Sequence, residues 1–485
     1  MAAQYRTFPR TKFIATLGPA SANSETLQQL LDAGVSVFRL NFSHGDNATR
    51  KQYLDLIRAH TSDQPVAIMG DLCGPKIRVG KMAGEGMAVA TGDMITIRRG
   101  EFLGQAGIIS SNFPRLIDDL EVGQRVLIED GLIRMLVVDK KADEVRCQVT
   151  TGGTIKSNKG LNLPNTQLST TSITAKDWDD VAFAIEHGLD YLALSFVRSA
   201  NDIYEVRRHL EMKQARIDLI AKIEMPQAVE NLAQIIEASD AVLVARGDLG
   251  VEMELTGLPI VQKRIVAAAQ DAGKPAIVAT QMLQSMVDNP SPTRAEVSDV
   301  ANAILDGADA CMLSNETAVG KYPVQAVLTL RQIAEKTEDY IEENHLEPKP
   351  PKLLQMTHHR TAAIARGARA IVDDINAKLM VVWSQAGGSA RYLSKNRFGV
   401  PIIALSSAPD AVRRMCLYYG VIPIQAQAPE TFDALPVLVD RIVHSYHLAE
   451  VGDRVVIAAG APLGIIGVTN SLSVQTVGRS LDSHS

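Results

Sequence analysis

Short apolar runs alternate with longer amphipathic segments between residues 11 and 340, and this alternation limits the possible folds more strongly than any other feature. A buried strand followed by a helix, repeated along a chain, is typical of a parallel β-sheet. Eight runs resemble such strands: Thr11–Leu17, Val35–Asn41, Val66–Asp71, Tyr191–Phe196, Leu219–Glu224, Ala241–Asp248, Ala276–Thr280 and Ala310–Ser314. Eight strand–helix units predict an α/β fold of the (β/α)8 or TIM barrel type.

The repeat is interrupted between the third and fourth runs, where the helical pattern disappears. Segments 87–99 and 125–139 alternate apolar and polar residues, and the second contains Asp130-Gly131, a common hairpin turn. We therefore expect residues 74–169 to form a small β-barrel domain inserted in a loop of the main barrel. An insert in that position would act as a lid.

A proline-rich segment at 347–351 separates the barrel pattern from a tail with strands of its own. Apolar runs at 378–384, 400–406 and 454–460 alternate there with helical segments, which predicts a C-terminal doubly wound α/β domain. The expected division is listed in chain order: barrel residues 1–73, inserted lid 74–169, barrel residues 170–345 and C-terminal α/β regulatory domain 346–485.

Length and composition exclude several classes of protein. The chain has 485 residues, enough for two or three domains, and its net charge of −6 argues against a nucleic-acid partner. The first 13 residues carry charges and a proline instead of a signal peptide's apolar stretch, and no later apolar run reaches membrane-spanning length. Four scattered cysteines predict neither a zinc site nor disulfides, but reduced thiols in a cytoplasmic protein: Cys73, Cys147, Cys311 and Cys416.

Polar residues follow five of the predicted strands, at the end of the barrel where catalytic groups lie. The strings are Arg39–Gly45, Gly70-Asp71, Lys222–Glu224, Arg246–Asp248 and Thr280-Gln281. Glu224 and Asp248 are suitable ligands for a hard cation, and Arg39 and Lys222 suit a phosphate. Together they predict phosphoryl transfer assisted by Mg²⁺.

Each residue taken alone has a simpler interpretation. Lys222 would be a solvated strand end, and Gly247 would belong to an ordinary turn. Asn41 and Ser43 fit a helix cap as well as a ligand, while His44 fits a hydrogen-bonded loop residue better than a base. The prediction of a site rests on five strand ends carrying such residues at once.

The local strings resemble, in order, motifs of the pyruvate kinase family. They are TLGPAS, RLNFSHG, GDLCGPKIRVG, AKIE, VARGDLGVE, ATQMLQSM and PTRAEVSDVANAILDGADACMLSNETAVGKYP, and SNKGLNLP resembles part of that family's lid. The resemblance spans nearly all of residues 1–325. It implies transfer of the phosphoryl group of phosphoenolpyruvate to ADP, giving pyruvate and ATP, the final step of glycolysis. It also implies Mg²⁺, with Mn²⁺ as the alternative ion, and a homotetramer.

The same resemblance implies roles for the residues around the substrate. Arg39 would bind the phosphate of phosphoenolpyruvate, Lys222 would stabilise the phosphoryl group in transfer, and Glu224 with Asp248 would hold the divalent ion. The backbone at Arg246, Gly247 and Asp248, together with the Thr280 hydroxyl, would bind the substrate carboxylate.

Further residues complete the implied site. Ser195 would lie beside the substrate, and Thr280, through water, is the candidate for the final proton transfer to the enolate. Nucleotide binding is expected at four residues: Asn41, His44, Arg78 and Lys159.

Lys76 is a departure from relatives that require potassium. Those relatives carry glutamate at the position of Lys76 and threonine at that of Leu72. A fixed ammonium resembles K⁺ in charge and size, so we predict activity without potassium. The alternative is that Lys76 is solvated and potassium still binds at Asn41, Ser43 and Asp71.

The tail contains a candidate effector loop. Ser384, Gly387, Gly388 and Ser389 follow a predicted strand and have the composition of a loop that holds phosphate. The family's C-terminal domain binds sugar phosphates or nucleotides, which makes such an effector the expected partner. The loop departs from the family at Gly388, where arginine is frequent, and an ordinary strand-to-helix turn is the alternative.

Two other classes of function compete with the kinase. Magnesium-dependent lyases that act on phosphoenolpyruvate or oxaloacetate share the barrel and the acid pair, but they lack a lid that carries residues such as Arg78 and Lys159. A metabolite-sensing barrel without catalysis would lack one of the four charged strand-end residues, and all four are present.

Overall fold

Eight parallel strands close into a barrel in which spatial order follows chain order. The structure is a computed structural model that describes residues 9–62, 64–164, 166, 168–357, 359–463 and 467–478. The strands are β1 (Lys12–Thr16), β2 (Val35–Asn41), β3 (Ala67–Asp71), β12 (Tyr191–Leu194), β13 (Asp218–Ile223), β14 (Ala241–Ala245), β15 (Ala276–Ala279) and β16 (Ala310–Leu313). Each lies within or overlaps a predicted run, which confirms the predicted barrel. Residues 1–8, part of the segment on which the signal-peptide argument rests, lie outside the described residues.

Helices follow the strands and form the outer layer of the barrel. They are α1 (Ser24–Ala33), α2 (Asn47–His60), α4 (Ala175–Glu186), α5 (Ala200–Met212), α6 (Pro226–Glu230), α7 (Leu232–Ala238), α8 (Arg246–Glu252), α9 (Leu258–Asp271), α10 (Arg294–Leu305), α11 (Asn315–Ala318) and α12 (Pro323–Glu343). Strand residues alternate between the two layers: Ile14 and Met69 belong to the barrel interior, whereas Phe13 and Ile68 pack against helices. Burial on both faces explains why the strands are continuous apolar runs.

The residues between β3 and α4 form the inserted β domain around an apolar core of its own. Its six-stranded sheet has the order β11-β7-β8-β9-β5-β6, and β10 pairs with β4. The elements are β4 (Met87–Val89), β5 (Met94–Arg98), β6 (Ile108–Ile109), α3 (Leu116–Asp119), β7 (Arg125–Ile128), β8 (Ile133–Lys140), β9 (Glu144–Thr151), β10 (Gly153–Ile155) and β11 (Leu161–Asn162). The hairpin predicted at Asp130-Gly131 joins antiparallel β7 and β8, and both residues have positive φ.

The insert differs from the predicted small barrel in how its edges pair. β11 and β6 are the outer strands of an open sheet, and isolated bridges such as Val79–Ser111 and Met82–Gly104 take the place of continuous pairing. The backbone turns repeatedly in this region, with positive φ at Gly84, Gly86 and Gly107. Such glycines interrupt an extended strand.

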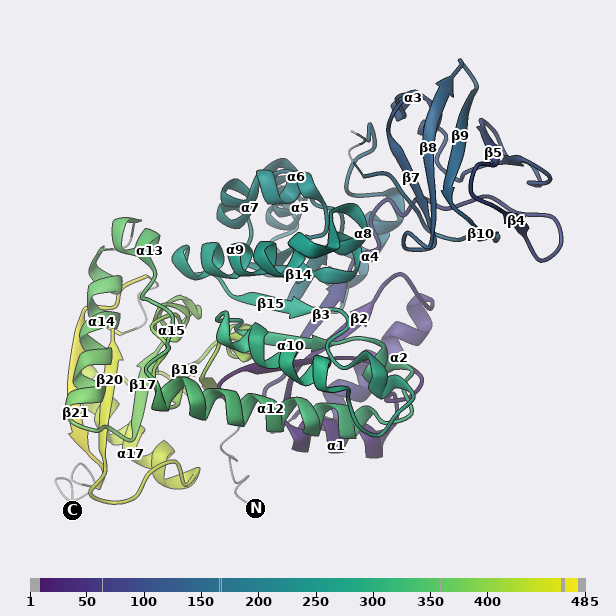
Figure 1. Ribbon diagram of the computed structural model, residues 1–485. Helices are drawn as coiled ribbons and strands as arrows, with labels where there is room; N and C mark the ends of the chain where they lie inside the picture. The colour runs from purple at the N-terminus through teal and green to yellow at the C-terminus, as the bar shows by residue number, and fades with distance from the viewer. Residues whose placement is uncertain are drawn as a thin grey trace.

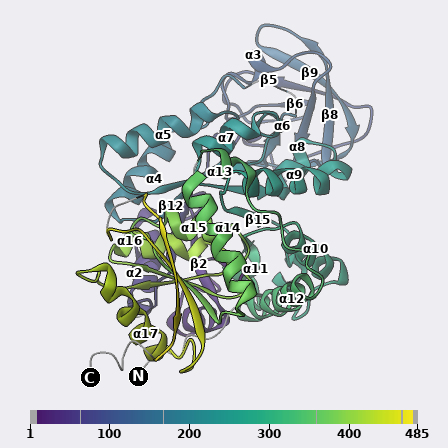
Figure 2. The same cartoon turned by 90° about the vertical axis from the view of Figure 1, so that its left-hand side faces the viewer.

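The C-terminal domain is a five-stranded sheet with helices on both faces, as a doubly wound fold requires. Its elements are α13 (Lys352–Thr357), α14 (His359–Asp374), β17 (Leu379–Trp383), α15 (Gly388–Ser394), β18 (Ile402–Ser406), α16 (Pro409–Arg414), β19 (Val421–Gln425), α17 (Leu435–Ser445), β20 (Arg454–Ala459) and β21 (Ser471–Thr476). Helix α17 covers one face, and α14, α15 and α16 cover the other. Figure 2 views the molecule from this domain, with α14 in front.

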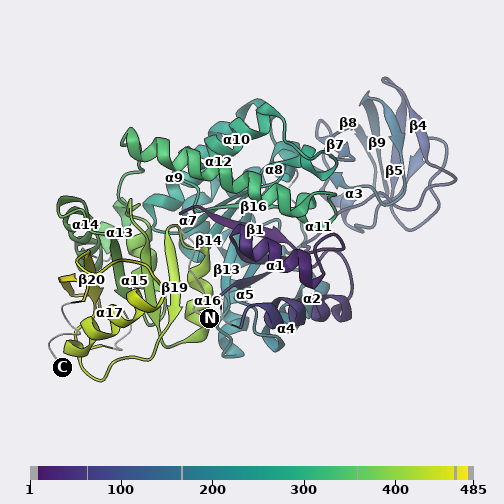
Figure 3. The same cartoon turned by 90° about the horizontal axis from the view of Figure 1, so that it is seen from below.

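The insert and the C-terminal domain lie at opposite ends of the barrel (Figures 1 and 3). The insert leaves the barrel after β3, at the carboxyl ends of the strands. The C-terminal domain contacts the other end, where Tyr191 at the start of β12 donates to the Arg414 carbonyl. Within the described residues, no helix combines the length and the apolar character needed to span a membrane.

Candidate active site

The ends of β2 and β3 bring Arg39 and Asp71 into contact. Arg39 Nε donates to Asp71 Oδ2 at 2.7 Å, and Arg39 Nη2 lies 2.6 Å from the same oxygen. Arg39 Nη1 also donates to Thr16 Oγ1, at 3.0 Å. The parallel pairing explains these contacts. Arg39 is opposite Thr16 on β1 and opposite Met69 on β3, and Asp71 follows Met69 by two residues on the same face of that strand. The guanidinium is therefore held in one orientation at the mouth of the barrel.

Lys222, on β13, lies between two carboxylates. Its Nζ donates to Ser195 Oγ at 2.6 Å and lies 2.7 Å from Glu224 Oε1 and 3.2 Å from Asp71 Oδ1. Only 11% of the lysine side chain is exposed, so the interpretation of Lys222 as a solvated strand end is wrong. Through Asp71, the same network includes Arg39.

Burial and charge act against each other in this network. Burial alone would raise the pKa of Asp71, but Lys222 and Arg39 lower it below its usual range. Burial would also lower the pKa of Lys222, but Asp71, Glu224 and Asp248 raise it above its usual range. For Glu224, burial and nearby Asp248 raise the pKa against the effect of Lys222. Lys222 is therefore a cation at neutral pH, and a further cation near Glu224 and Asp248 would be stabilised.

Gly247 and Thr280 meet where β14 and β15 end. Thr280 Oγ1 accepts from the Gly247 backbone N–H at 2.7 Å, and Arg246 Nη2 donates to the Thr280 carbonyl at 2.8 Å. Thr280 and Gln281 have φ values of 68° and 53°, a backbone conformation that a β-branched residue rarely adopts. Contacts from Arg246 and Gly247 help to keep Thr280 in this conformation.

The sixth predicted run continues too far. Strand β14 ends at Ala245, and helix α8 begins at Arg246, so the predicted end at Asp248 is wrong. Asp248 instead lies in the first turn of α8, a favourable place for a carboxylate because the helix dipole is positive there. The interpretation of Gly247 as part of an ordinary turn is wrong for the same reason.

The loop after β2 places Asn41, Ser43 and His44 at the rim of the barrel. Asn41 Oδ1 accepts from the Ser43 N–H at 3.1 Å, while Ser43 and His44 are exposed. Neither Asn41 nor Ser43 caps the following helix, because the cap of α2 is Asp46. Among the described residues, no hydrogen bond joins the side chains of this loop to Lys222.

Arg78 and Lys159 come from neighbouring segments of the insert. Arg78 forms an isolated antiparallel bridge with Gly160, the residue after Lys159. Arg78 Nη1 donates to the Asn158 carbonyl at 2.8 Å, and Lys159 Nζ lies 2.5 Å from Glu129 Oε1. Both cations are therefore paired within the insert.

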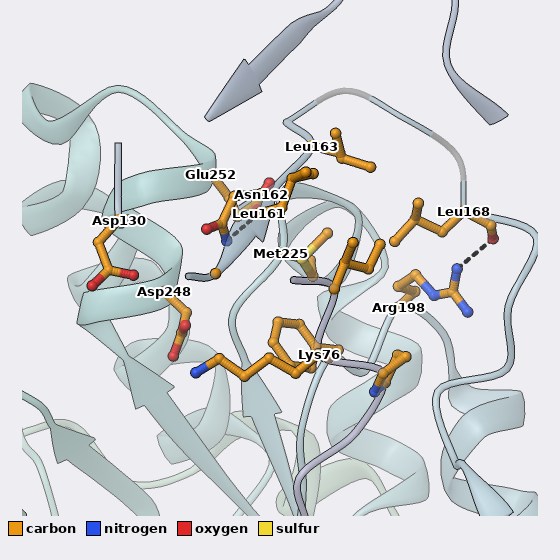
Figure 4. Close-up of a pocket in the computed structure, with 14 residues that line it drawn as sticks. Lys76, Asp130, Leu161, Asn162, Leu163, Leu168, Arg198, Met225, Asp248 and Glu252 are labelled. Atoms are coloured by element: carbon orange, nitrogen blue, oxygen red, sulfur yellow. Dashed lines mark hydrogen bonds between the residues drawn. The ribbon is translucent and has the colours of Figure 1, made fainter. Parts of the chain in front are cut away.

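A cavity of about 40 Å³ lies between the insert and the barrel (Figure 4). Figure 4 shows the Lys76 side chain crossing this cavity with its ammonium directed toward Asp248. Across from it, Asn162 Nδ2 donates to Glu252 Oε1 at 2.8 Å. Leu72 is buried, and its carbonyl accepts from Ser195 Oγ at 2.7 Å.

The residues present fit a divalent ion shared with a substrate. No group of three or more His, Cys, Asp or Glu side chains in the described part of the chain is arranged to hold a metal alone. Glu224 and Asp248 offer two carboxylates instead, and their mutual repulsion raises the pKa of Glu224 after the larger effect of burial. Mg²⁺ is usually bound in this way, by one or two carboxylates and oxygens of a phosphorylated substrate.

The candidate effector loop borders a cavity of about 310 Å³ in the C-terminal domain. Ser384, Gly388 and Ser389 line it, Gly387 has φ of 89°, and the hydroxyls of Ser389 and Thr469 are 2.5 Å apart. The loop is also the turn between β17 and α15, so both interpretations of the segment fit its position.

Several side chains around the site have no predicted role, among them that of Arg246, for which only the backbone was assigned one. Thr16 holds Arg39, Arg246 holds Thr280, and Asn162 with Glu252 joins the insert to the barrel. The sequence contained one usable signal: Glu252 follows Asp248 by four residues, which places both carboxylates on one face of a helix.

Comparison with known proteins agrees with this arrangement. Residues 8–327 match the family model described as pyruvate kinase, barrel domain, and residues 362–475 match pyruvate kinase, alpha/beta domain. Pyruvate kinase 2 of Synechocystis is 42% identical over 478 residues, 96% of this chain and 79% of the relative. Pyruvate kinase of Mycobacterium intracellulare is 39% identical over 472 residues, 97% of this chain and 99% of the relative.

A crystal structure of a pyruvate kinase from Cryptosporidium parvum matches with a TM-score of 0.88 at 33% identity, covering 97% of this chain and 96% of that one. The two family models together span both the barrel and the C-terminal domain. These matches favour the kinase over the lyase and over the metabolite-sensing barrel. The chain therefore belongs to the pyruvate kinase family, as its motifs predict, and is a phosphotransferase.

Proposed function

We propose that the network around Lys222 carries out transfer of the phosphoryl group of phosphoenolpyruvate to ADP, giving pyruvate and ATP. One observation carries this proposal: at the carboxyl end of the barrel, Lys222 Nζ lies within 3.2 Å of Ser195, Glu224 and Asp71. A buried ammonium held among acids is a preorganised positive charge, which is what a phosphoryl group in transfer requires.

Arg39 and Lys222 divide the work on the phosphoryl group. Arg39 binds the phosphate of phosphoenolpyruvate with a guanidinium that Asp71 and Thr16 already orient. Lys222 offsets charge on the phosphoryl group while it moves to an ADP oxygen, and on the enolate oxygen that is left behind. Because its pKa is raised, the ammonium keeps its proton throughout.

The substrate carboxylate binds at the start of α8. The Gly247 N–H and the Thr280 hydroxyl are in contact there, and with the backbone of Arg246 and Asp248 they would bind the carboxylate. Ser195, which contacts Lys222, would lie beside the substrate. The enolate takes up a proton at carbon to become pyruvate. Thr280, acting through a water molecule, is our candidate for delivering that proton.

Glu224 and Asp248 would hold Mg²⁺, with Mn²⁺ as the alternative ion. When bound, the ion supplies positive charge to the phosphoryl oxygens and orients the substrate. Lys222 and Glu224 are in contact at 2.7 Å, so the chain's own cation and its metal ligand act on the same phosphoryl group.

The insert supplies the nucleotide side of the site. Arg78 and Lys159 would bind the phosphates of ADP after exchanging their partners within the insert, and Asn41 and His44 at the rim of the barrel would complete this subsite. These residues would come from two domains, the barrel and the lid, which meet at the cavity. The proposed division is 1–73 and 170–345 for the barrel, 74–169 for the lid and 346–485 for the regulatory domain.

Lys76 would take the place of a potassium ion. Its ammonium is directed toward Asp248, beside the proposed metal and substrate positions, and Leu72 has no side-chain oxygen to offer an ion. In this proposal Asn41, Ser43 and Asp71 need no bound potassium.

Regulation and assembly follow the family in our proposal. A sugar phosphate or a nucleotide would bind at the loop of Ser384, Gly387, Gly388 and Ser389, next to the cavity of about 310 Å³. The enzyme would be a homotetramer in the cytoplasm.

The test is pyruvate formation from phosphoenolpyruvate with Mg²⁺, with and without ADP, in a buffer whose only other cation is tetramethylammonium. We expect turnover that requires ADP and that falls about 10²- to 10³-fold in Lys222→Met. Turnover without ADP would favour the lyase, and absence of turnover with or without added potassium would contradict the kinase.

A further inference from the structure

The insert and the barrel share one hydrogen bond between side chains in the described residues, from Asn162 Nδ2 to Glu252 Oε1 at 2.8 Å (Figure 4). Asn162 belongs to β11, which pairs with β7 in the six-stranded sheet of the insert. Two residues before it, Gly160 forms the bridge with Arg78. The contact therefore holds the part of the insert that carries both Arg78 and Lys159.

The two segments that connect the insert to the barrel are anchored on the barrel side. On the outgoing segment, the Gly74 N–H donates to Asp177 Oδ1 at 3.1 Å. On the returning segment, Arg198 Nη1 donates to the Leu168 carbonyl at 2.7 Å. These bonds fix where the chain crosses, whereas the Asn162–Glu252 bond fixes how the body of the insert lies on α8.

Glu252 is deeply buried for a residue that joins two domains. Only 3% of the residue is exposed, and Oε2 is buried without a hydrogen-bond partner among the described residues. It lies one turn after Asp248 on α8, so the helix that presents a proposed metal ligand also contacts the insert. A half-satisfied buried carboxylate is costly and is kept where it serves a purpose.

We propose that Glu252 is a positioning residue that holds the insert against the barrel through Asn162 and thereby sets the affinity for the nucleotide. The inference rests on the proposed nucleotide-binding role of the insert. In this view Glu252 touches neither substrate; it places Arg78 and Lys159 where ADP binds.

Docking of the insert on the barrel should weaken as the pH rises, because a charged Glu252 is costly to bury. The pKa of Glu252 is raised to about 7, chiefly by burial; Asp248 and Glu224 add to this effect, and Asn162 and Arg125 oppose it. Glu252 lines the cavity between the insert and the barrel, and the other charged residues that line it, besides Asp248, are Lys76, Asp130 and Arg198. If the insert lifts, Glu252 meets water and regains an ordinary pKa near 4.5.

Docking of the insert therefore takes up a proton at pH values between about 4.5 and 7. The stabilisation of the docked state by this protonation is fully present below about pH 4.5 and is lost as the pH rises through 7. Between pH 6 and pH 8 the docking equilibrium would fall about tenfold.

The test compares Asn162→Ala, Glu252→Ala and the double variant in the full-length enzyme, with the exposed Gln148→Ala in the insert as control. We expect each single variant to raise the KM for ADP about fivefold. The KM for phosphoenolpyruvate should change less, and the double variant should be no worse than either single one. Hydrogen exchange at residues 74–78 and 160–164 should accelerate in the same variants.

A second measurement uses Glu252→Gln, whose amide oxygen can still accept from Asn162 but cannot titrate. Relative to this variant, the KM for ADP of the unmodified enzyme should rise with pH between 6 and 8. The quantity compared is the ratio of the two KM values, unmodified enzyme over Glu252→Gln, in which effects of pH on ADP and Mg²⁺ themselves cancel.

Wild-type KM and exchange rates in Asn162→Ala, or a ratio that does not vary with pH, would overturn the proposal. Arg78→Ala separates the two ideas. If Arg78→Ala leaves the KM for ADP unchanged, the nucleotide role of the insert fails, and hydrogen exchange in Asn162→Ala then decides the positioning role alone.

Discussion

Asp71 is the residue that makes the site a unit. Its two carboxylate oxygens lie near different cations, Oδ2 at Arg39 and Oδ1 at Lys222. Without this acid, the guanidinium and the ammonium would repel each other in a buried place. The pairing keeps two positive charges beside the proposed position of one phosphoryl group, and in this proposal neither cation has to move during transfer.

Replacing Lys222 with methionine should remove transition-state stabilisation while preserving substrate binding by Arg39. We expect kcat to fall about 10²- to 10³-fold, with a smaller change in the KM for phosphoenolpyruvate. Steady-state kinetics at saturating Mg²⁺ would check this, with the exposed Lys336→Met as control. A variant whose KM rises while kcat is preserved would show that Lys222 binds substrate and does not act on the transition state.

Replacing Lys76 with glutamate should create a need for potassium. The change removes the ammonium directed toward Asp248 and supplies the carboxylate that potassium-requiring relatives carry. We expect activity in tetramethylammonium to fall and to recover on addition of KCl, while the unmodified enzyme shows neither effect. Lys81→Glu, at an exposed position of the insert, is the matched control. A Lys76→Glu enzyme indifferent to potassium would contradict the substitution.

At this scale, the sequence predicts groups at strand ends but not the groups that orient them. Arg39, Lys222 and Glu224 follow apolar runs, which is a local signal. Thr16 contacts Arg39 from a strand 23 residues earlier, and Asn162 contacts Glu252 across 90 residues. Side chains brought together over such separations leave no periodic pattern in the chain.

Among the elements, the barrel strands were predictable because burial on both faces makes each one a continuous apolar run. Two strands of the C-terminal sheet, β19 and β21, were not predicted, and each has a physical reason. Strand β19 contains Pro423, which argues against a strand, yet an edge strand tolerates proline because one side needs no partner. Strand β21 pairs antiparallel at the other edge, and its exposed Val474 breaks the pattern expected of a buried parallel strand.

Strand β3 is packed so closely that a methyl group should disturb the neighbouring loop. A Cβ on Gly70 would lie 2.8 Å from ring carbons of Phe42, which is fully buried. We expect Gly70→Ala to lower the free energy of unfolding by about 1–3 kcal/mol and to displace the Asn41–His44 loop. Urea unfolding and the KM for ADP would measure both effects.

Gly388→Ala is the control for this change, because nothing lies within 4 Å of a Cβ placed there. Equal stability of the two variants would show that β3 and Phe42 can move apart at little cost.

In the whole molecule, the two ends of the barrel have different tasks. Carboxyl ends of strands carry the proposed chemistry, while the amino-terminal ends carry acids that meet cations of the C-terminal domain. Asp190 lies 2.8 Å from Arg413, and Asp309 lies 2.7 Å from Lys395. The sequence pattern predicts three domains but not these pairs, because the partners lie as much as 223 residues apart in the chain.

Asp309 is the acid on which the junction depends most. It is fully buried, accepts from the Ala276 N–H and faces both Lys395 and Arg397, which are 1% and 3% exposed. Asp309→Asn would leave two buried cations without a counter-charge, so we expect a loss of about 3–5 kcal/mol in the free energy of unfolding. Lys395→Met leaves Asp309 paired with Arg397 and should cost about 1 kcal/mol or less.

The loss in the free energy of unfolding caused by Asp309→Asn, its stability deficit, should also depend on pH. Burial lowers the pKa of Lys395 to about 8, against the effect of Asp309, so removing the acid lowers it further. A lowered lysine pKa destabilises the folded state at pH values below it, and this penalty is relieved as the pH rises and the folded lysine loses its proton. Relief begins at lower pH in the variant, so its deficit should shrink as the pH approaches 8. Urea unfolding at pH 6, 7 and 8 measures this, and a deficit that is constant with pH, or one matched by Lys395→Met, would mean that packing and not charge joins the two domains.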